Sequence, residues 1–504
     1  MLFGATGDLV RKKLMPVLYQ MAKAGRLGVP VIGVARSGWG DPRLRNYARG
    51  RRGDRGRRGG RGGVRPAGRE PDDARRRLRR LGDYDELAKR LEGTDRPVFY
   101  LAIPPSVFPQ VVQGLAKAGL AARGRVIVEK PFGRDQESAR ELNGWLAGAF
   151  EQRSIFRIDH YLGKESVEGL LVFRFANTFL EPFWNRNYVA GVQITLGEAF
   201  GTEGRAGFYD GVGAIRDVLQ NHLLQVVALL AMEPPIADDA DAYRDEEVKV
   251  LRQIAPLQPR NTVRGKHVGY LDEEGVAASS TTETFVLTCL TIESWRWAGG
   301  PFYPLPGKNM PGSATEAVVE LRRPPRLLFA GQDADVPSTN LVRFRLGHSD
   351  GVTLSVQAKA PGARTLTQPV DLNVDFESAL GHRREAYERL LDDALDGRRL
   401  RFAREDTIGK SGASSTRSWT CPTGLSRTTR GPGGVRRRTR PRTGGTTWHC
   451  ARSRPNARAL ALPARSWLRS ARTDDHPVEH RRALQVHQHA GADQEDDRPR
   501  QDLA

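Results

Sequence analysis

The segment RIDHYLGKE, residues 157–165, concentrates chemically active side chains directly after an apolar, strand-like run. It places a carboxylate, an imidazole, a phenol and an ammonium group within six residues, Asp159 to Lys164. Lys164 and His160 can supply positive charge and Tyr161 a hydroxyl donor, which suits an anionic substrate. A polar surface loop is the alternative interpretation, but such a loop gains nothing from this density of titratable groups.

A second cluster lies in IRDVLQNHLLQ, residues 215–225. On an α-helix Asp217 and Asn221 are one turn apart on one face, and His222 lies on a neighbouring face. A single histidine on a helix is more often a structural residue than a catalytic one. His222 becomes a candidate general base where a carboxylate orients its other ring nitrogen.

The first residues resemble a nucleotide-binding turn. GATGDL, residues 4–9, follows a short apolar strand and opens a helix. Gly4 permits the tight turn, Gly7 allows close approach of a pyrophosphate, and the helix N-terminus complements its charge. The G-x-x-G spacing also fits any glycine-containing turn from a strand to a helix. The second strand ends in VARS, where Arg36 can pair with the 2′-phosphate of NADP or lie free on the surface, and the two features together favour NADP.

Strand patterns alternate with helix patterns over the first 160 residues, which predicts a parallel, doubly wound sheet. The predicted strands are 1–6, 29–37, 97–105, 125–130 and 155–160, and helices are expected through Leu14 to Met21, over 107–118 and near 138–149. Beyond Tyr161 a helix over 214–232 precedes several alternating strands. These predict a large, mostly antiparallel sheet with helices on one face. We therefore expect an α/β dinucleotide-binding domain over 1–158 and a larger α+β domain over 159–407.

The net charge of +20 comes from two arginine-rich segments. Residues 41–80 contain 16 arginines and 5 acidic residues, and residues 408–504 contain 18 arginines, 1 lysine and 8 acidic residues. Neither segment has a hydrophobic period that could form a core, so 408–504 is expected to be a disordered tail. Their aromatic residues are sparse, which argues against specific nucleic-acid binding and favours salt-sensitive, non-specific association.

The composition gives no sign of a membrane or secreted protein. No apolar run approaches the roughly 20 residues that span a bilayer, and MLFGATGDL lacks the features of a signal peptide. The three cysteines, Cys289, Cys421 and Cys450, have no metal-binding spacing and cannot form a disulfide framework. We expect a cytoplasmic protein.

Several motifs, in this order along the chain, resemble the glucose-6-phosphate dehydrogenase family: GATGDL, VARS, YLAIPP, EKPFG, RIDHYLGKE, EAFGTEGRAGFYDGVGAIRDVLQNHLLQ, WRWAGGPFY and PLPGK. The resemblance covers nearly all of residues 1–40 and 81–407. It implies oxidation of D-glucose 6-phosphate to 6-phospho-D-glucono-1,5-lactone with NADP, the first oxidative step of the pentose phosphate pathway. It also implies a homodimer or homotetramer built on the large sheet, and no metal.

The resemblance carries roles onto matching positions. It implies that His222 is the general base and Asp159 the carboxylate that orients it. It further implies two binding sets. The substrate set is Lys130, His160, Tyr161, Lys164, Glu198, Asp217 and Lys308. The cofactor set is Gly4, Gly7, Asp8, Leu9, Lys13, Arg36 and Lys130, with Lys130 contacting both ligands.

The chain also departs from the family. Ser313 stands where an arginine is usual, and the two arginine-rich segments match nothing in it; they resemble GC-rich coding sequence read in a shifted frame. The alternatives are therefore an inactive, frameshifted member and an NADP-dependent sugar oxidoreductase of the glucose–fructose oxidoreductase type. RIDHYLGKE argues against the latter.

Overall fold

The computed structural model describes residues 1–35, 82–130, 136–324, 338–347, 349–363 and 365–407, and three short strands beyond them, Ser426–Thr428, Thr447–Trp448 and Leu462–Pro463. Arg36, all of the first arginine-rich segment (41–80) and most of the second lie outside these residues. Within the described part, no helix combines the length and apolar character needed to cross a membrane.

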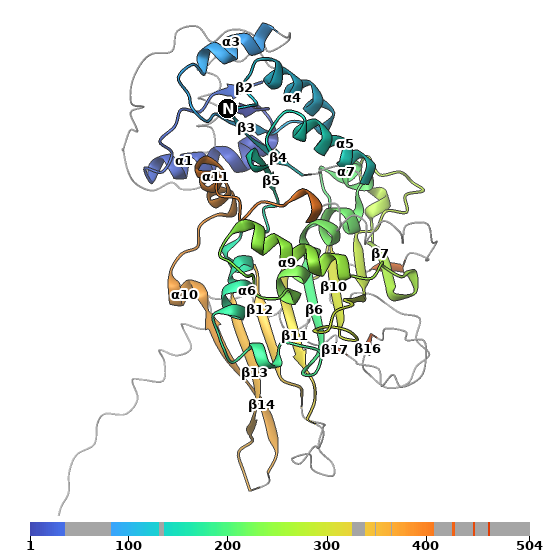
Figure 1. Ribbon diagram of the computed structural model, residues 1–504. Helices are drawn as coiled ribbons and strands as arrows, with labels where there is room; N and C mark the ends of the chain where they lie inside the picture. Colours follow the sequence, from blue (N-terminus) through green and yellow to red (C-terminus); the bar gives the residue numbers. More distant parts are fainter. Residues whose placement is uncertain are drawn as a thin grey trace, which may run out of the picture.

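The N-terminal part is a five-stranded, all-parallel sheet with the order β2-β1-β3-β4-β5 (Figure 1). Its apolar strands are buried between helices, as expected for a parallel sheet covered on both faces. The predicted dinucleotide-binding fold is confirmed. Its strands are β1 (Leu2–Phe3), β2 (Gly33–Val34), β3 (Val98–Leu101), β4 (Arg125–Glu129) and β5 (Ile155–Ile158), and its helices are α1 (Met15–Lys23), α3 (Gly82–Arg90), α4 (Phe108–Lys117) and α5 (Gln136–Ala147).

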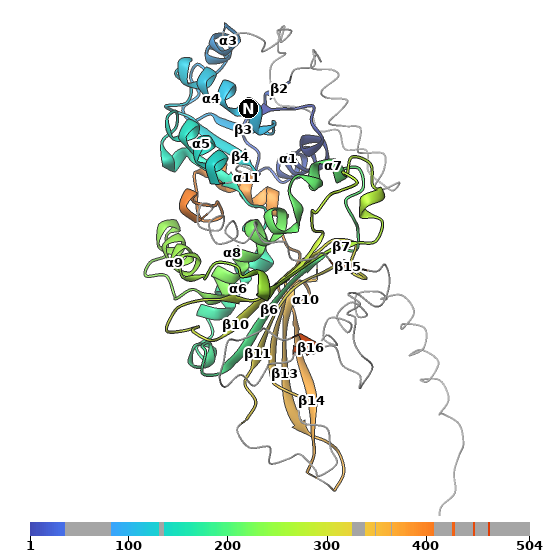
Figure 2. The same ribbon diagram turned by 90° about the vertical axis from the view of Figure 1, so that its right-hand side faces the viewer.

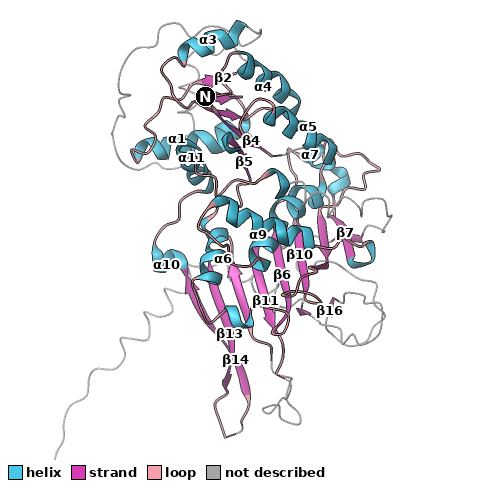
Figure 3. Ribbon diagram, viewed as in Figure 1, coloured by secondary structure: helices cyan, strands magenta, loops and turns pink. Residues whose placement is uncertain are grey.

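The second part is built on a larger sheet, as predicted (Figure 3). Its order is β14-β13-β12-β11-β6-β10-β8-β7-β15, and most neighbours are antiparallel. The strands are β6 (Val189–Gly197), β7 (Thr262–His267), β8 (Phe285–Thr288), β9 (Leu290–Thr291), β10 (Pro301–Gly307), β11 (Ala314–Leu321), β12 (Leu341–Arg345), β13 (Gly351–Lys359), β14 (Thr367–Asp375) and β15 (Ser426–Thr428).

Helices cover one face of this sheet (Figure 2). They are α6 (Glu165–Phe175), α8 (Leu224–Ala231) and α9 (Ala240–Gln253). All eight residues of α8 are buried, and the main core lies between them and the inward side chains of β6, β10 and β11. Such an all-round apolar helix is expected where it lies beneath a second helix, here α9.

Strand β10 was not predicted, and its sequence PFYPLPG explains why. Prolines lack the N–H group that a strand interior needs. The pairing of β10 with β6 is parallel and continuous from Phe302 to Gly307, but on its other side β10 pairs only at its two ends. Between these ends, the strand pairing of β10 with β8 and β9 is interrupted over a stretch that includes Pro304 and Pro306. Because no backbone hydrogen bonds to those strands are needed there, the prolines are tolerated.

The chain returns to the first sheet after β14. Helix α10 (Phe376–Leu380) is followed by α11 (Ala386–Asp396), which lies beside α1 (Figure 1). Leu390 and Ala394 of α11 belong to the same buried cluster as Leu14 and Met21 near α1. Residues of the predicted second domain therefore complete the core of the first.

Candidate active site

The turn after β1 has the geometry that the glycines predicted. Gly4 has φ +80°, and a Cβ there would lie 2.1 Å from the Ala102 carbonyl oxygen. Only glycine fits this position without displacing backbone. The Gly7 N–H donates to the Gly4 carbonyl at 2.8 Å, and a π-helical turn, Val10–Leu14, leads into α1. Asp8 is exposed and pairs with Lys12 at 2.8 Å, and Leu9 is half-buried.

His222 and Asp159 form a buried pair. His222 Nδ1 lies 2.8 Å from Asp159 Oδ1, and that oxygen also accepts the Tyr161 N–H at 3.0 Å. The carboxylate comes from the end of β5 and the histidine from a helix 63 positions later, so the fold unites the two sequence clusters. The condition for a catalytic histidine, a carboxylate on one ring nitrogen, is met.

The helix that carries His222 is not the α-helix expected from its sequence. Ile215–Leu223 is a π-helix, in which hydrogen bonds span five residues rather than four. Asp217 and His222, five positions apart, therefore come to one face. Lys130 contacts both, with Nζ 3.8 Å from Asp217 Oδ1 and 2.5 Å from His222 Nε2. Asn221 instead turns its amide to the Arg216 carbonyl at 2.8 Å.

Burial and neighbouring charge set the protonation of the pair. Burial lowers the pKa of His222, and the nearby Asp159 only partly opposes this effect. Burial would raise the pKa of Asp159, but His222 and Lys130 lower it overall. At neutral pH the pair therefore consists of a neutral imidazole and a carboxylate. Since Nδ1 faces the carboxylate, the proton belongs on Nδ1, and Nε2 carries the lone pair that faces the Lys130 ammonium. Nε2 can accept another proton once Lys130 moves away from it.

The loop from Asp159 to Lys164 surrounds this pair. The Tyr161 ring stacks on the His222 ring with centroids 4.2 Å apart, and the His160 ring meets His222 edge-on at 4.9 Å. Lys164 Nζ lies 3.9 Å from the centroid of the Tyr161 ring. Burial lowers the pKa of Lys164 and holds the pKa of His160 well below its ordinary value. Burial removes water from the charged forms of Lys164 and His160, and a bound anion would compensate for this lost hydration.

Glu198 and Lys308 close another side of the site. Glu198 follows β6 and Lys308 follows β10, and these parallel strands bring the two side chains into an ion pair. Glu198 is close enough to Tyr161 and Lys164 to act on the pKa of each. Lys13, in the π-helical segment Val10–Leu14, also lowers the pKa of Lys164. The cofactor and substrate candidates therefore border one region.

Asp159, His160 and His222 offer ligand atoms that lie within 4.8 Å of one another, close enough for a metal ion. The Lys130 ammonium, however, contacts His222 Nε2 directly. This fixed positive charge opposes a cation at the same place. The cluster is better explained by a histidine–carboxylate pair beside a loop whose side chains suit an anion.

Comparison with known proteins agrees with this arrangement. Residues 1–169 match the model for the NAD binding domain of glucose-6-phosphate dehydrogenase, and residues 171–420 match the model for its C-terminal domain. The chain belongs to the glucose-6-phosphate dehydrogenase family. The boundary between the two matches, at residues 169–171, lies inside α6, shortly after the 157–165 motif.

Named relatives and a solved structure extend the match. The chain is 41% identical to glucose-6-phosphate 1-dehydrogenase 2 of Mycobacterium tuberculosis, over 79% of this chain and 82% of the relative. It is 39% identical to the enzyme of Aggregatibacter actinomycetemcomitans, over 81% and 87%. The crystal structure of the Mycobacterium avium glucose-6-phosphate 1-dehydrogenase is 38% identical, with a TM-score of 0.76, over 86% of this chain and 94% of that one.

A second solved structure shows a glucose-6-phosphate dehydrogenase in complex with its substrate, glucose 6-phosphate. It is 35% identical with a TM-score of 0.75, over 86% of this chain and 94% of that chain.

Ser313 stands at the position where the sequence comparison expected an arginine. Its hydroxyl accepts a hydrogen bond from the Ala199 N–H at 3.0 Å, beside Glu198. In this family member the position therefore supports backbone near the site.

The structure adds residues that the sequence did not single out. Glu129, the glutamate of EKPFG, accepts hydrogen bonds from the hydroxyls of Tyr100 and Tyr387. The Tyr387 ring lies parallel to the His160 ring, with centroids 6.4 Å apart. The position of Glu129 beside Lys130 was a possible signal, but Tyr387 comes from α11 and no local pattern marks it.

Proposed function

We propose that this chain oxidises D-glucose 6-phosphate to 6-phospho-D-glucono-1,5-lactone with reduction of NADP. The observation that carries the proposal is the His222–Asp159 pair beside the loop that holds His160, Tyr161 and Lys164, in a member of this family. A neutral imidazole is suited to remove the proton of a sugar hydroxyl. Histidine, tyrosine and lysine donors on one loop are suited to a phosphate monoester.

Each group has a role in the proposed reaction. His222 Nε2 accepts the proton of the C1 hydroxyl as the C1 hydride leaves, and Asp159 stabilises the imidazolium that forms. Lys130 is displaced from His222 Nε2 and binds the sugar beside Asp217. The phosphate is bound by His160, Tyr161 and Lys164. Glu198 and Lys308 bind the sugar phosphate from another side of the site. Bound NADP supplies the hydride acceptor, C4 of its nicotinamide.

The nucleotide turn fits a dinucleotide. Gly4 and Gly7 leave the backbone uncovered where a pyrophosphate would approach, and the helix that begins after them can favour an anion. We assign Gly4, Gly7, Asp8, Leu9 and Lys13 to this site. Arg36 lies outside the described residues, and its pairing with the 2′-phosphate stays a prediction.

The test is a substrate panel on the purified chain. NADP reduction should occur with glucose 6-phosphate and be much slower with glucose or fructose. His222→Asn should lower kcat at least roughly a hundredfold with little change in substrate binding. Equal rates with phosphorylated and free sugars would favour a sugar oxidoreductase of another type. No turnover with any sugar would favour an inactive member of the family.

We also propose a homodimer or homotetramer formed through the large sheet, acting in the cytoplasm. Strand β14 is an edge strand whose apolar side chains Val370, Leu372 and Val374 are exposed. An exposed apolar edge strand favours association. Sedimentation of the parent and of Leu372→Asp should distinguish an assembled parent from a dissociated variant; a monomeric parent would refute the proposal.

A further inference from the structure

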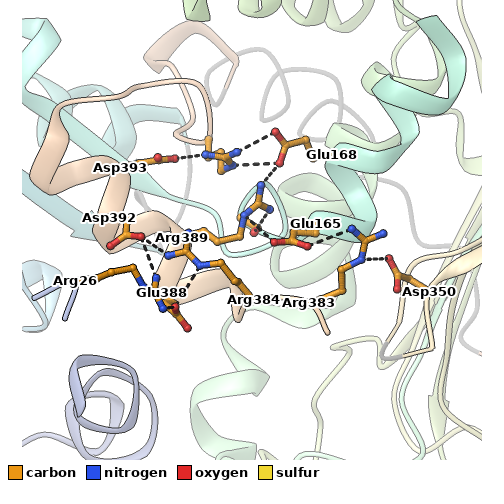
Figure 4. A network of polar contacts seen from close by, with 12 residues as sticks. Arg26, Glu165, Glu168, Asp350, Arg383, Arg384, Glu388, Arg389, Asp392 and Asp393 are labelled. Atoms are coloured by element: carbon orange, nitrogen blue, oxygen red, sulfur yellow. Dashed lines mark hydrogen bonds and ion pairs between the residues drawn. The ribbon is translucent and has the colours of Figure 1, made fainter. Parts of the chain in front are cut away.

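Helix α11 contacts the candidate phosphate-binding loop although more than 220 positions separate them. Arg389 Nη1 donates to the Gly163 carbonyl at 2.8 Å, and its other nitrogens pair with Glu168 and with Glu165, the latter at 3.5 Å. Figure 4 shows Arg389 between α11 and these acids. Arg389 is buried, and Gly163 lies one residue before Lys164.

The fit between α11 and Gly163 is close. A Cβ on Gly163 would lie 2.8 Å from Leu390 Cδ1 and 3.0 Å from the Ala386 carbonyl oxygen. The φ of Gly163 is not in the left-handed region, so its backbone would accept alanine. What excludes a side chain at this position is therefore contact with α11.

The same helix is held to the dinucleotide-binding part from another side. Arg26, after α1, pairs with Glu388 and with Asp392, at 3.2 Å to the latter (Figure 4). Arg125 of β4 donates to the Ala394 carbonyl at 3.0 Å. Glu388 and Asp392 lie one turn apart on one face, while Arg389 and Asp393 form the next face.

The second face is tied to α6. Arg401 donates to Asp393 at 2.6 Å and to Glu168 at 3.0 Å, so Glu168 is shared by Arg389 and Arg401. Two arginines and two acids, all at least partly removed from solvent, hold α11 against α6, which begins directly after Lys164. Such paired, partly buried charges fix geometry more than they stabilise the fold.

We propose that α11 is a positioning element for the phosphate site, and that Arg389 is the positioning residue that sets loop 159–164 relative to the dinucleotide-binding domain. The inference rests on the proposed function, because it assigns the loop to the phosphate of glucose 6-phosphate. Its consequence is that affinity for the sugar phosphate depends on a helix that does not bind it. The affinity for NADP does not depend on this contact.

The test compares Arg389→Leu and Gly163→Ala with the parent. Each should raise KM for glucose 6-phosphate about tenfold or more, and leave kcat within about threefold and KM for NADP within about twofold. Arg389→Lys retains the charge but reaches only one partner, so its KM should lie between those of the parent and Arg389→Leu. Arg384→Gln is the matched control, because among the described residues Arg384 pairs with Glu388 and Asp392 and not with the loop or α6.

The outcomes separate the two proposals. If the parent oxidises glucose 6-phosphate, and Arg389→Leu and Gly163→Ala have the same KM for it as the parent, the positioning role is refuted and the proposed function is not. Equal increases in both KM values with a lower unfolding temperature indicate a purely structural contact and also refute it. Should Arg389→Leu fail to fold, Gly163→Ala and Arg389→Lys decide the matter. A parent that neither oxidises nor binds glucose 6-phosphate refutes both.

Discussion

Replacing Asp159 by asparagine tests the electrostatic part of the proposed mechanism. The amide keeps an oxygen that can accept from His222 Nδ1 and from the Tyr161 N–H, which lie 2.8 and 3.0 Å from Asp159 Oδ1. The shape of the site is therefore retained and only the negative charge is lost. Any effect on rate then reports how much the carboxylate stabilises the imidazolium that forms as His222 accepts the proton.

The size of the effect follows from the geometry. Opposite charges centred about 4 Å apart attract by about 4 kcal/mol at an effective dielectric constant near 20. At about 1.4 kcal/mol for each factor of ten, the loss corresponds to about a thousandfold in rate. We expect Asp159→Asn to lower kcat about 10²–10³-fold, with a small change in KM for NADP.

The assay is the initial rate of NADP reduction across pH, with thermal unfolding as a check of the fold. The exposed Asp272 provides a control substitution, Asp272→Asn, of the same chemical type. The carboxylate raises the pKa of His222, so its removal should lower that pKa further and move the acid limb of kcat to lower pH. A variant with kcat within threefold of the parent, or an acid limb displaced upward, would show that Asp159 does not act through charge.

Three further predictions concern other parts of the chain. Arg36→Ala should weaken the binding of NADP by roughly 1.5–3 kcal/mol and the binding of NAD much less, because only NADP has the 2′-phosphate. Equal increases in KM for the two cofactors would contradict this assignment. Burial raises the pKa of Glu247 to about 7 from 4.5, so the parent should lose on the order of 3 kcal/mol of unfolding free energy as pH rises from below 4.5 through 7. Glu247→Gln should flatten that dependence in denaturant titrations, and an unchanged slope would rule out the neutral carboxyl. Deleting residues 408–504 removes the short edge strand β15 and should change the unfolding temperature little. Replacing residues 41–80 with a family-like segment should raise soluble yield and activity. If the parent is already soluble and fully active and the replacement brings no gain, the frameshift hypothesis is contradicted.

The sequence by itself determined the elements that local patterns encode. Buried apolar runs marked β3, β4 and β5, because strands covered on both faces read as continuous hydrophobic segments. Gly4 marked the nucleotide turn, since its backbone conformation excludes other residues. Dense titratable residues marked both clusters of the candidate site. Each of these signals lies within about ten neighbouring residues.

Only the tertiary structure decided how these pieces meet. Periodicity cannot distinguish a hydrogen bond that spans four residues from one that spans five, so the common face of Asp217 and His222 was not foreseen. The contacts of Tyr387 with Glu129 and of Arg389 with Gly163 join segments more than 220 positions apart. Such contacts depend on how α11 packs on the first sheet. That packing involves residues far apart in the sequence, so no local sequence pattern predicts it. The sequence therefore supplied the candidate reacting groups, whereas the packing of β5 and of the π-helix Ile215–Leu223 decided how Asp159 and His222 meet.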